Sequence, residues 1–258
     1  MKIRRAIIGS CLLCALLASL FAVQGASAAG TTGYTCVKGK GELRGEHCLT
    51  SGTAPAEYGH VAVPVNTTTE GTVTNETTSG VKDSGKLKAT IAGVAITLTA
   101  TGANGSGWGT NAEEGGEMFA HGEGTTTFTG VTATGSCKVF TDSGAGKGEE
   151  GVIHTEPLKA TSKGQGDSGK LEPKEGTVFA RFILEGCVNS GINGTYTVTG
   201  SIKPTTLEGS TVSYTHANTT EQNTLRLNGT IKAGVEIATT GRGRANASEA
   251  YTPGGATT

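Results

Sequence analysis

Residues 93–100 read Gly-Val-Ala-Ile-Thr-Leu-Thr-Ala, a stretch in which large apolar side chains alternate with small or polar ones. In an extended chain, Val94, Ile96 and Leu98 lie on one face and the residues between them on the other. This period of two predicts a half-buried β-strand. Residues 177–185 alternate in the same way but are apolar on both faces, which indicates a strand at the centre of a sheet.

Other short segments with strand character follow one another along the chain, and turn residues separate nearly all of them. The chain contains 43 Thr, which favours extended backbone, and 42 Gly, which permits tight turns. The sequence therefore predicts an all-β fold, an antiparallel β-sandwich or barrel-like domain of many short strands. The further strands are expected at residues 58–65, 86–91, 125–134, 137–140, 152–160, 195–203, 210–216, 224–231 and 235–239.

Two segments lack this alternation. Residues 66–79 are rich in Thr, Asn and Glu, and we expect either an edge strand or a mobile loop there. Residues 241–258 show no apolar periodicity and are expected to form a flexible C-terminal tail. A single β-rich domain is therefore expected to span residues 29–240.

The N-terminal residues 1–28 have the features of a secretory signal peptide, with an expected helix in the apolar part. Three basic residues within the first five positions precede a long apolar run, and Ala26 and Ala28 suit signal peptidase cleavage before Ala29. Two alternatives are an uncleaved membrane anchor and a lipoprotein modified at Cys11. We expect a protein that is secreted or held at the cell surface, with no membrane span in the mature chain.

The charge balance argues against nucleic acid as a partner. Removing the three basic residues of the signal peptide leaves 18 Lys and Arg against 22 Asp and Glu, a net charge near −4. A protein that binds the phosphate backbone usually carries a basic surface.

Four cysteines remain in the mature chain. An even number in an exported protein favours two disulfide bonds, among three connectivities. We expect Cys36 to pair with Cys48 and Cys137 with Cys187. These bonds would stabilise the fold.

One tetrapeptide points to catalysis. Gly-Asp-Ser-Gly around Ser168 resembles the nucleophile motif of trypsin-like serine proteases, and His47 with the following cysteine resembles their histidine motif. Such an enzyme would use Ser168 as nucleophile, His47 as general base and Asp83 to orient it. However, all three aspartates of the chain lie in Asp-Ser-Gly tripeptides, which are ordinary turns. We therefore expect no catalytic residues and keep an extracellular hydrolase as the alternative.

Metal and cofactor motifs are missing from the sequence. The histidines are scattered singly and no Cys-x-x-Cys or EF-hand spacing occurs, so no metal site and no cofactor is expected. Glu113, Glu114, Glu117 and Glu123 lie close together in the sequence and could supply the two carboxylates of a glycoside hydrolase. A solvated acidic loop is the simpler interpretation.

The only tryptophan, Trp108, is the candidate binding residue. It lies in the glycine-rich residues 104–109, where we expect a loop. An exposed Trp108 could stack on a sugar, whereas a Trp108 folded back would cap the core, and the second outcome is favoured. The expected partner of an exposed Trp108 is cell-wall polysaccharide or another envelope protein.

The mature chain resembles an uncharacterised family of exported Thr/Gly-rich β proteins of high-GC Gram-positive soil bacteria. Members often carry two further cysteines, near Thr99 and just after residues 146–148, and both are absent here. The resemblance thus favours the bond between Cys137 and Cys187, and it implies export and β architecture without an activity. The residues that carry it are Thr35-Cys36-Val37, His47-Cys48, Glu57-Tyr58-Gly59-His60-Val61-Ala62, Ile91-Ala92-Gly93, Gly146-Lys147-Gly148, Glu156-Pro157-Leu158-Lys159-Ala160-Thr161, Gly176-Thr177-Val178-Phe179-Ala180, Glu185-Gly186-Cys187 and Thr219-Thr220-Glu221-Gln222-Asn223-Thr224-Leu225.

Together these features predict a secreted or cell-envelope-associated, non-catalytic β protein with a structural or binding role. The alternatives are the extracellular hydrolase and a carbohydrate-binding module.

Overall fold

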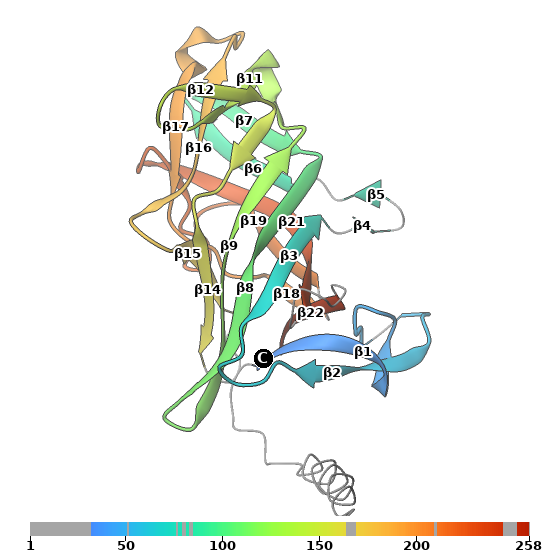
Figure 1. The fold of residues 1–258 in the computed structure, drawn as a ribbon. Coiled ribbons are helices and arrows are strands. Elements are labelled where there is room, and N and C mark those ends of the chain that lie inside the picture. The colour runs from blue at the N-terminus through green and yellow to red at the C-terminus, as the bar shows by residue number, and fades with distance from the viewer. Residues whose placement is uncertain are drawn as a thin grey trace, which may run out of the picture.

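The structure is a computed structural model that describes residues 32–50, 52–75, 77–78, 81–82, 85–163, 169–208, 211–244 and 252–257. Within these ranges the chain forms 22 strands and two short 3₁₀ helices, with no α-helix. All pairings between the strands are antiparallel, so the expected all-β class is confirmed (Figure 1). The expected signal-peptide residues 1–28 lie outside the described residues.

The strands are mostly short, as the many glycines and threonines led us to expect, but four of them have seven residues, one has eight, and four are longer still, at 13 or 14. In chain order the elements are β1 Thr32–Arg44, β2 Ala56–Ala62, β3 Thr69–Asn75, β4 Thr77–Thr78, β5 Val81–Lys82, β6 Gly85–Ile91, β7 Val94–Ala100, β8 Gly102–Glu114, β9 Glu117–Thr129, β10 Thr132–Ala133, η1 Thr134–Ser136, β11 Lys138–Asp142, β12 Lys147–Glu150, β13 Val152–His154, β14 Leu158–Lys163, β15 Lys170–Pro173, β16 Val178–Glu185, η2 Ser190–Ile192, β17 Gly194–Thr199, β18 Thr206–Glu208, β19 Thr211–His216, β20 Arg226–Leu227, β21 Ile231–Arg244 and β22 Thr252–Thr257.

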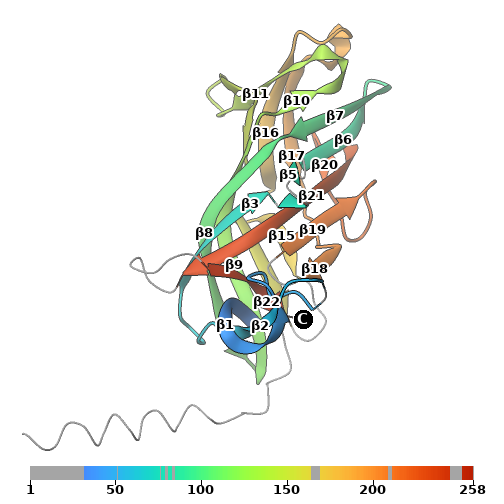
Figure 2. The ribbon, with the colours of Figure 1, turned by 90° about the vertical axis from the view of Figure 1, so that its right-hand side faces the viewer.

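The long strand β21 organises the sheet (Figure 2). One of its edges pairs with β6 and then with β3, which lie end to end. Its other edge pairs in turn with β20, β19 and β22. From β3 the sheet continues through β8 to the long strand β9, and from β6 it continues through β7 to β10.

A second run of strands brings the sheet back toward its start. β9 pairs with β13 and β14, and the main-chain N–H of Glu156 donates a hydrogen bond to Phe179 of β16. β16 pairs with β17, β17 with β20, and β20 with β21. This succession gives the sheet its barrel-like curl.

The main core lies inside the curl. Strand β16 has neighbours on both edges, β11 and β17, as expected for a central strand. Its Phe182 and Leu184 are 1% and 0% exposed, and the Phe182 ring stacks on Tyr196 at 5.4 Å between centroids. Each side chain of this size stabilises the fold by roughly 1.5–3 kcal/mol on burial.

Strands β1 and β2 form a separate lobe at one end of the molecule (Figure 1). A disulfide bond between Cys36 and Cys48 ties β1 to the turn that follows it, and the Tyr34 ring stacks on His60. The second disulfide bond joins Cys137 to Cys187 beside the main core. Both bonds have the expected connectivity, and paired cysteines are typical of proteins that fold in an oxidising environment.

Two expectations about irregular segments need correction. β3 lies between β8 and β21, so residues 69–75 are neither an edge strand nor a loop. Strand β21 continues to Arg244 and β22 pairs with β1, so these parts of the expected tail are strands. The central position of the first segment and the strands in the second were not predicted, because main-chain hydrogen bonds hold them and few large apolar side chains make a period visible.

Candidate functional site

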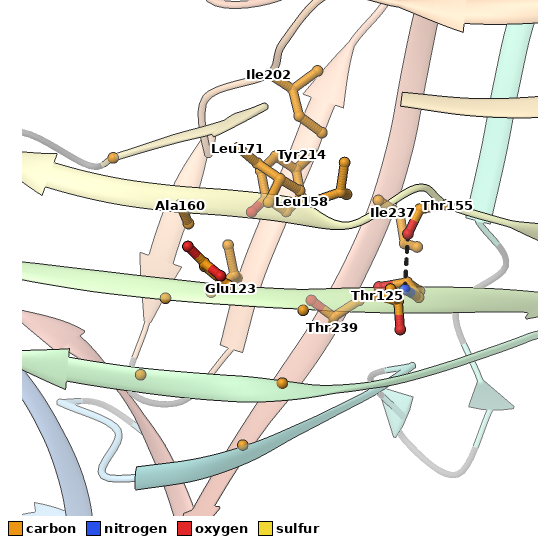
Figure 3. A pocket seen from close by; sticks show the side chains of 18 of the residues that line it. Glu123, Thr125, Thr155, Leu158, Ala160, Leu171, Ile202, Tyr214, Ile237 and Thr239 are labelled. Atoms are coloured by element: carbon orange, nitrogen blue, oxygen red, sulfur yellow. Dashed lines mark hydrogen bonds between the residues drawn. The ribbon is translucent and has the colours of Figure 1, made fainter. Parts of the chain in front are cut away.

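The inside of the curled sheet holds a cavity of about 510 Å³ (Figure 3). This volume falls within the ~300–1,000 Å³ of typical small-molecule sites. The large side chains on its inner face come from strands far apart in the sequence and are nearly all apolar: Leu87, Leu98, Phe128, Ile153, Leu158, Leu171, Ile202, Tyr214, Val235 and Ile237. Charged residues such as Lys86, Glu123 and Arg242 also border the cavity. The cavity is therefore suited to an apolar ligand.

One wall of the cavity consists of glycine. Gly71, Gly107 and Gly124 lie opposite one another on β3, β8 and β9, and Gly109 and Gly122 form a second pair on the next row. They share a sheet face with Leu158, which pairs with Gly124. The glycines leave bare backbone where side chains would otherwise fill the interior, and they ease the curvature of the sheet.

Close approach of backbone explains why two of these positions, Gly107 and Gly124, must be glycine. A methyl group on Gly107 would overlap the main chain of β9 at Glu123 and Gly124. At Gly109 a methyl group would make only an ordinary contact, at 3.6 Å from the His121 carbonyl oxygen. This wall was not predicted because residues 104–109 were expected to form a loop. The signal was present as glycine at every second position, 105, 107 and 109.

Polar groups on the inner face are few and uncharged. Tyr214 lies on β19 opposite Ile237, and Thr239 follows two residues later on β21. Leu158, Leu171 and Tyr214 appear close together in Figure 3, and all three belong to the main core or pack against it. Burial raises the pKa of Tyr214 to about 12, so its phenol keeps its proton at neutral pH.

Charged residues gather beside Trp108 on the same wall, and Glu123 among them also borders the cavity in Figure 3. Trp108 lies directly across from Glu123, which in turn lies across from Lys159. The Glu123 carboxylate accepts a hydrogen bond from Lys174 at 2.7 Å and is 3.5 Å from His121 Nε2. The hydrogen bond from Lys174 lowers the pKa of Glu123, with a smaller contribution from His121. The negative charge of Glu123 is thus compensated by the positive charge of Lys174.

Trp108 itself occupies neither of the two expected positions. It is a half-buried residue in the middle of β8, and the centroid of its ring lies 5.3 Å from the centroid of the His121 ring. It is therefore not on an exposed loop, and it does not belong to the buried core. The loop expectation is wrong because the glycines around Trp108 belong to a strand.

The candidate catalytic set is not brought together within the described residues. His47 lies in the turn between β1 and β2, with Nε2 3.5 Å from the Glu46 carboxylate. Ser168 and Asp83 lie outside the described part of the chain. Glu113, Glu114 and Glu117 surround the turn between β8 and β9, whereas Glu123 lies within β9 and pairs with Lys174, so the four glutamates do not form one loop.

No cluster of three or more His, Cys, Asp or Glu side chains suited to a metal ion occurs among the described residues. In the same ranges, no helix has the length and apolar character that crossing a membrane requires.

The lobe of β1 and β2 borders one end of the cavity, where Gly33, Tyr34 and Thr35 contribute to the lining. Asn111, near the end of β8, binds this lobe to the wall of the cavity. Its side chain is 0% exposed, donates to the carbonyl oxygens of Gly33 and Val63, and accepts from the Gly33 N–H. This buried carboxamide and the pairing of β1 with β22 thus fix the position of the lobe at the cavity.

No protein-family model, no curated protein and no solved structure matches this chain.

Proposed function

We propose that this chain is a secreted or cell-envelope-associated, non-catalytic binding protein that holds an apolar small molecule inside its curled sheet. The observation that carries the proposal is the cavity of about 510 Å³ with its nearly continuous apolar lining. Transfer of apolar surface from water into such a site gains roughly 25 cal/mol for each Å² buried. A core without a ligand function would be packed at crystal-like density and would leave few voids larger than a water molecule.

The composition of the inner face supports binding over catalysis. The inward polar groups described above are a phenol and hydroxyls. Glu123 and His121 also border the cavity, but the Glu123 carboxylate is bound by Lys174 at 2.7 Å. General acid and base groups must reach the substrate to act on it. The two disulfide bonds and the signal-peptide features support a location outside the cytoplasm.

The proposal can be tested with the mature protein and N-phenyl-1-naphthylamine, an uncharged apolar probe whose fluorescence rises in apolar surroundings. We expect saturable binding with a dissociation constant in the micromolar range, as ligand efficiencies of about 0.3 to 0.5 kcal/mol per heavy atom imply. An absence of saturable binding would contradict the proposal.

A matched pair of variants on β14 locates the probe. Ala160 lines the cavity, while its neighbour Lys159 projects from the other face of the strand. Ala160→Phe should fill part of the cavity and weaken binding at least about tenfold, and Lys159→Phe should leave it unchanged. Ala160→Leu, a smaller change, provides the same test if the Phe variant is unstable. Equal effects at both positions would place the probe elsewhere.

A further inference from the structure

We infer that the ligand of this cavity is a long, uncharged chain that carries a single hydrogen-bonding oxygen, of the kind found in long-chain alcohols. The inference rests on the proposed function and specifies the ligand class.

The shape of the cavity favours a chain. On β9 its lining runs from Phe128 to Ala120, a span of eight residues, or about 26 Å at ~3.3 Å per residue. The glycine wall allows close contact with backbone along its length, which suits a thin ligand better than a globular one.

The charges around the cavity argue against an ionised ligand. Lys86 is bound by Glu236 at 2.8 Å, and Glu123 is bound by Lys174 at 2.7 Å. Both residues border the cavity, as does Arg242, which lies 3.6 Å from the Glu46 carboxylate, so each of these charges already has an opposite charge beside it. A carboxylate or phosphate inside would lose its hydration and would have to compete with these partners for a positive charge, which is strongly unfavourable.

Tyr214 supplies the complementary group for one ligand oxygen. It lines the cavity among apolar neighbours, opposite Ile237 and on the same inner face as Val212. A protonated phenol both donates and accepts a hydrogen bond, so it can pair with an alcohol hydroxyl in either direction. A hydrocarbon of the same length would leave this group without that partner.

The test compares 1-dodecanol, dodecanoate and dodecane as competitors of N-phenyl-1-naphthylamine at pH 7, each below its aggregation concentration. Dodecanol should bind at least about tenfold more tightly than dodecanoate because the carboxylate has no counter-ion inside. Tyr214→Phe should weaken dodecanol about fivefold, the effect of one hydrogen bond, and leave dodecane unchanged. Tyr58→Phe is the control, since Tyr58 lies in the β1 and β2 lobe.

Each outcome has a separate meaning. Dodecanoate binding as tightly as dodecanol, or equal effects of Tyr214→Phe on dodecanol and dodecane, would overturn the ligand class while the binding function stands. Failure of the probe and of all three competitors to bind would instead overturn the proposed function.

Discussion

The side chain of Asn111 forms two hydrogen bonds with the main chain of Gly33, accepting from its N–H at 2.6 Å and donating to its carbonyl oxygen at 2.9 Å. A third bond, to the carbonyl oxygen of Val63, reaches the segment after β2 at 2.6 Å. The Asn111 carboxamide on β8 thus forms the hydrogen bonds that a neighbouring strand would otherwise make with the main chain of the lobe, at Gly33 in β1 and at Val63 after β2. Gly33 and Val63 also line the cavity, so the same contacts define one of its ends.

Asn111→Ala should therefore destabilise the protein by about 1–3 kcal/mol, because the Gly33 N–H and the Val63 carbonyl oxygen lose this partner, whereas the Gly33 carbonyl oxygen still accepts a hydrogen bond from the Val63 N–H. Urea unfolding followed by the fluorescence of Trp108 measures this loss. Asn104→Ala, at an exposed position on the same strand, is the control and should change stability by less than about 0.5 kcal/mol. Equal effects of the two substitutions would show that the lobe is held by other contacts.

The two disulfide bonds should differ in their effect on stability. The bond between Cys36 and Cys48 closes a loop of 12 residues, and that between Cys137 and Cys187 one of 50. The loop-entropy model gives about 3 kcal/mol for the first and about 4 kcal/mol for the second. Replacing each pair with alanine and measuring urea unfolding tests the order. A larger loss from the shorter loop would show that chain entropy does not set their contributions.

The sequence predicted the parts of the fold whose signal is local. Val94, Ile96 and Leu98 alternate within seven residues, and β7 and β16 lie close to where the period of two indicated. The closing of the curl through the two-residue strand β20 depends on contacts between distant segments, which no local period reveals. The cavity depends on the same contacts.

The candidate site was missed for a different physical reason. Periodicity detects apolar side chains, and the wall formed by Gly107 and Gly124 has none. Trp108 drew attention because it is large, yet the glycines beside it shape the cavity. In a curled sheet, glycine at every second position is thus a signal for an inward face.

Acid should weaken the contact between β6 and β21. Hydrogen bonds from Lys86 and Lys88 lower the pKa of Glu236 to about 2. A lowered carboxyl pKa stabilises the fold above the ordinary value of 4.5, and this contribution is lost as the pH falls from 4.5 toward 2. Because these side chains are partly exposed, solvent screening limits the effect to about 1 kcal/mol or less.

Glu236→Gln should accordingly reduce stability slightly at pH 7 and flatten its decline between pH 4.5 and 2. Urea unfolding across this pH range measures both effects. Glu42→Gln, on an exposed position of β1, serves as the matched carboxyl replacement and should leave the decline in place. If the stability of Glu236→Gln declined in acid as steeply as that of the unsubstituted protein, this ion pair would not be a cause of the decline.

The glycine wall gives the sharpest contrast between neighbouring positions. Gly107→Ala should cost about 1–3 kcal/mol, because its methyl group would overlap the main chain of β9 and force the two strands apart. Gly109→Ala, two residues along the same face, meets its nearest atom at 3.6 Å and should be tolerated.

Urea unfolding gives the two stabilities, and probe fluorescence gives the affinity of each variant. Because Gly107 lies between Gly71 and Gly124 in the wall, the Gly107 variant should also bind the probe more weakly. A Gly107→Ala protein as stable and as competent in binding as Gly109→Ala would mean that close backbone approach does not shape the cavity.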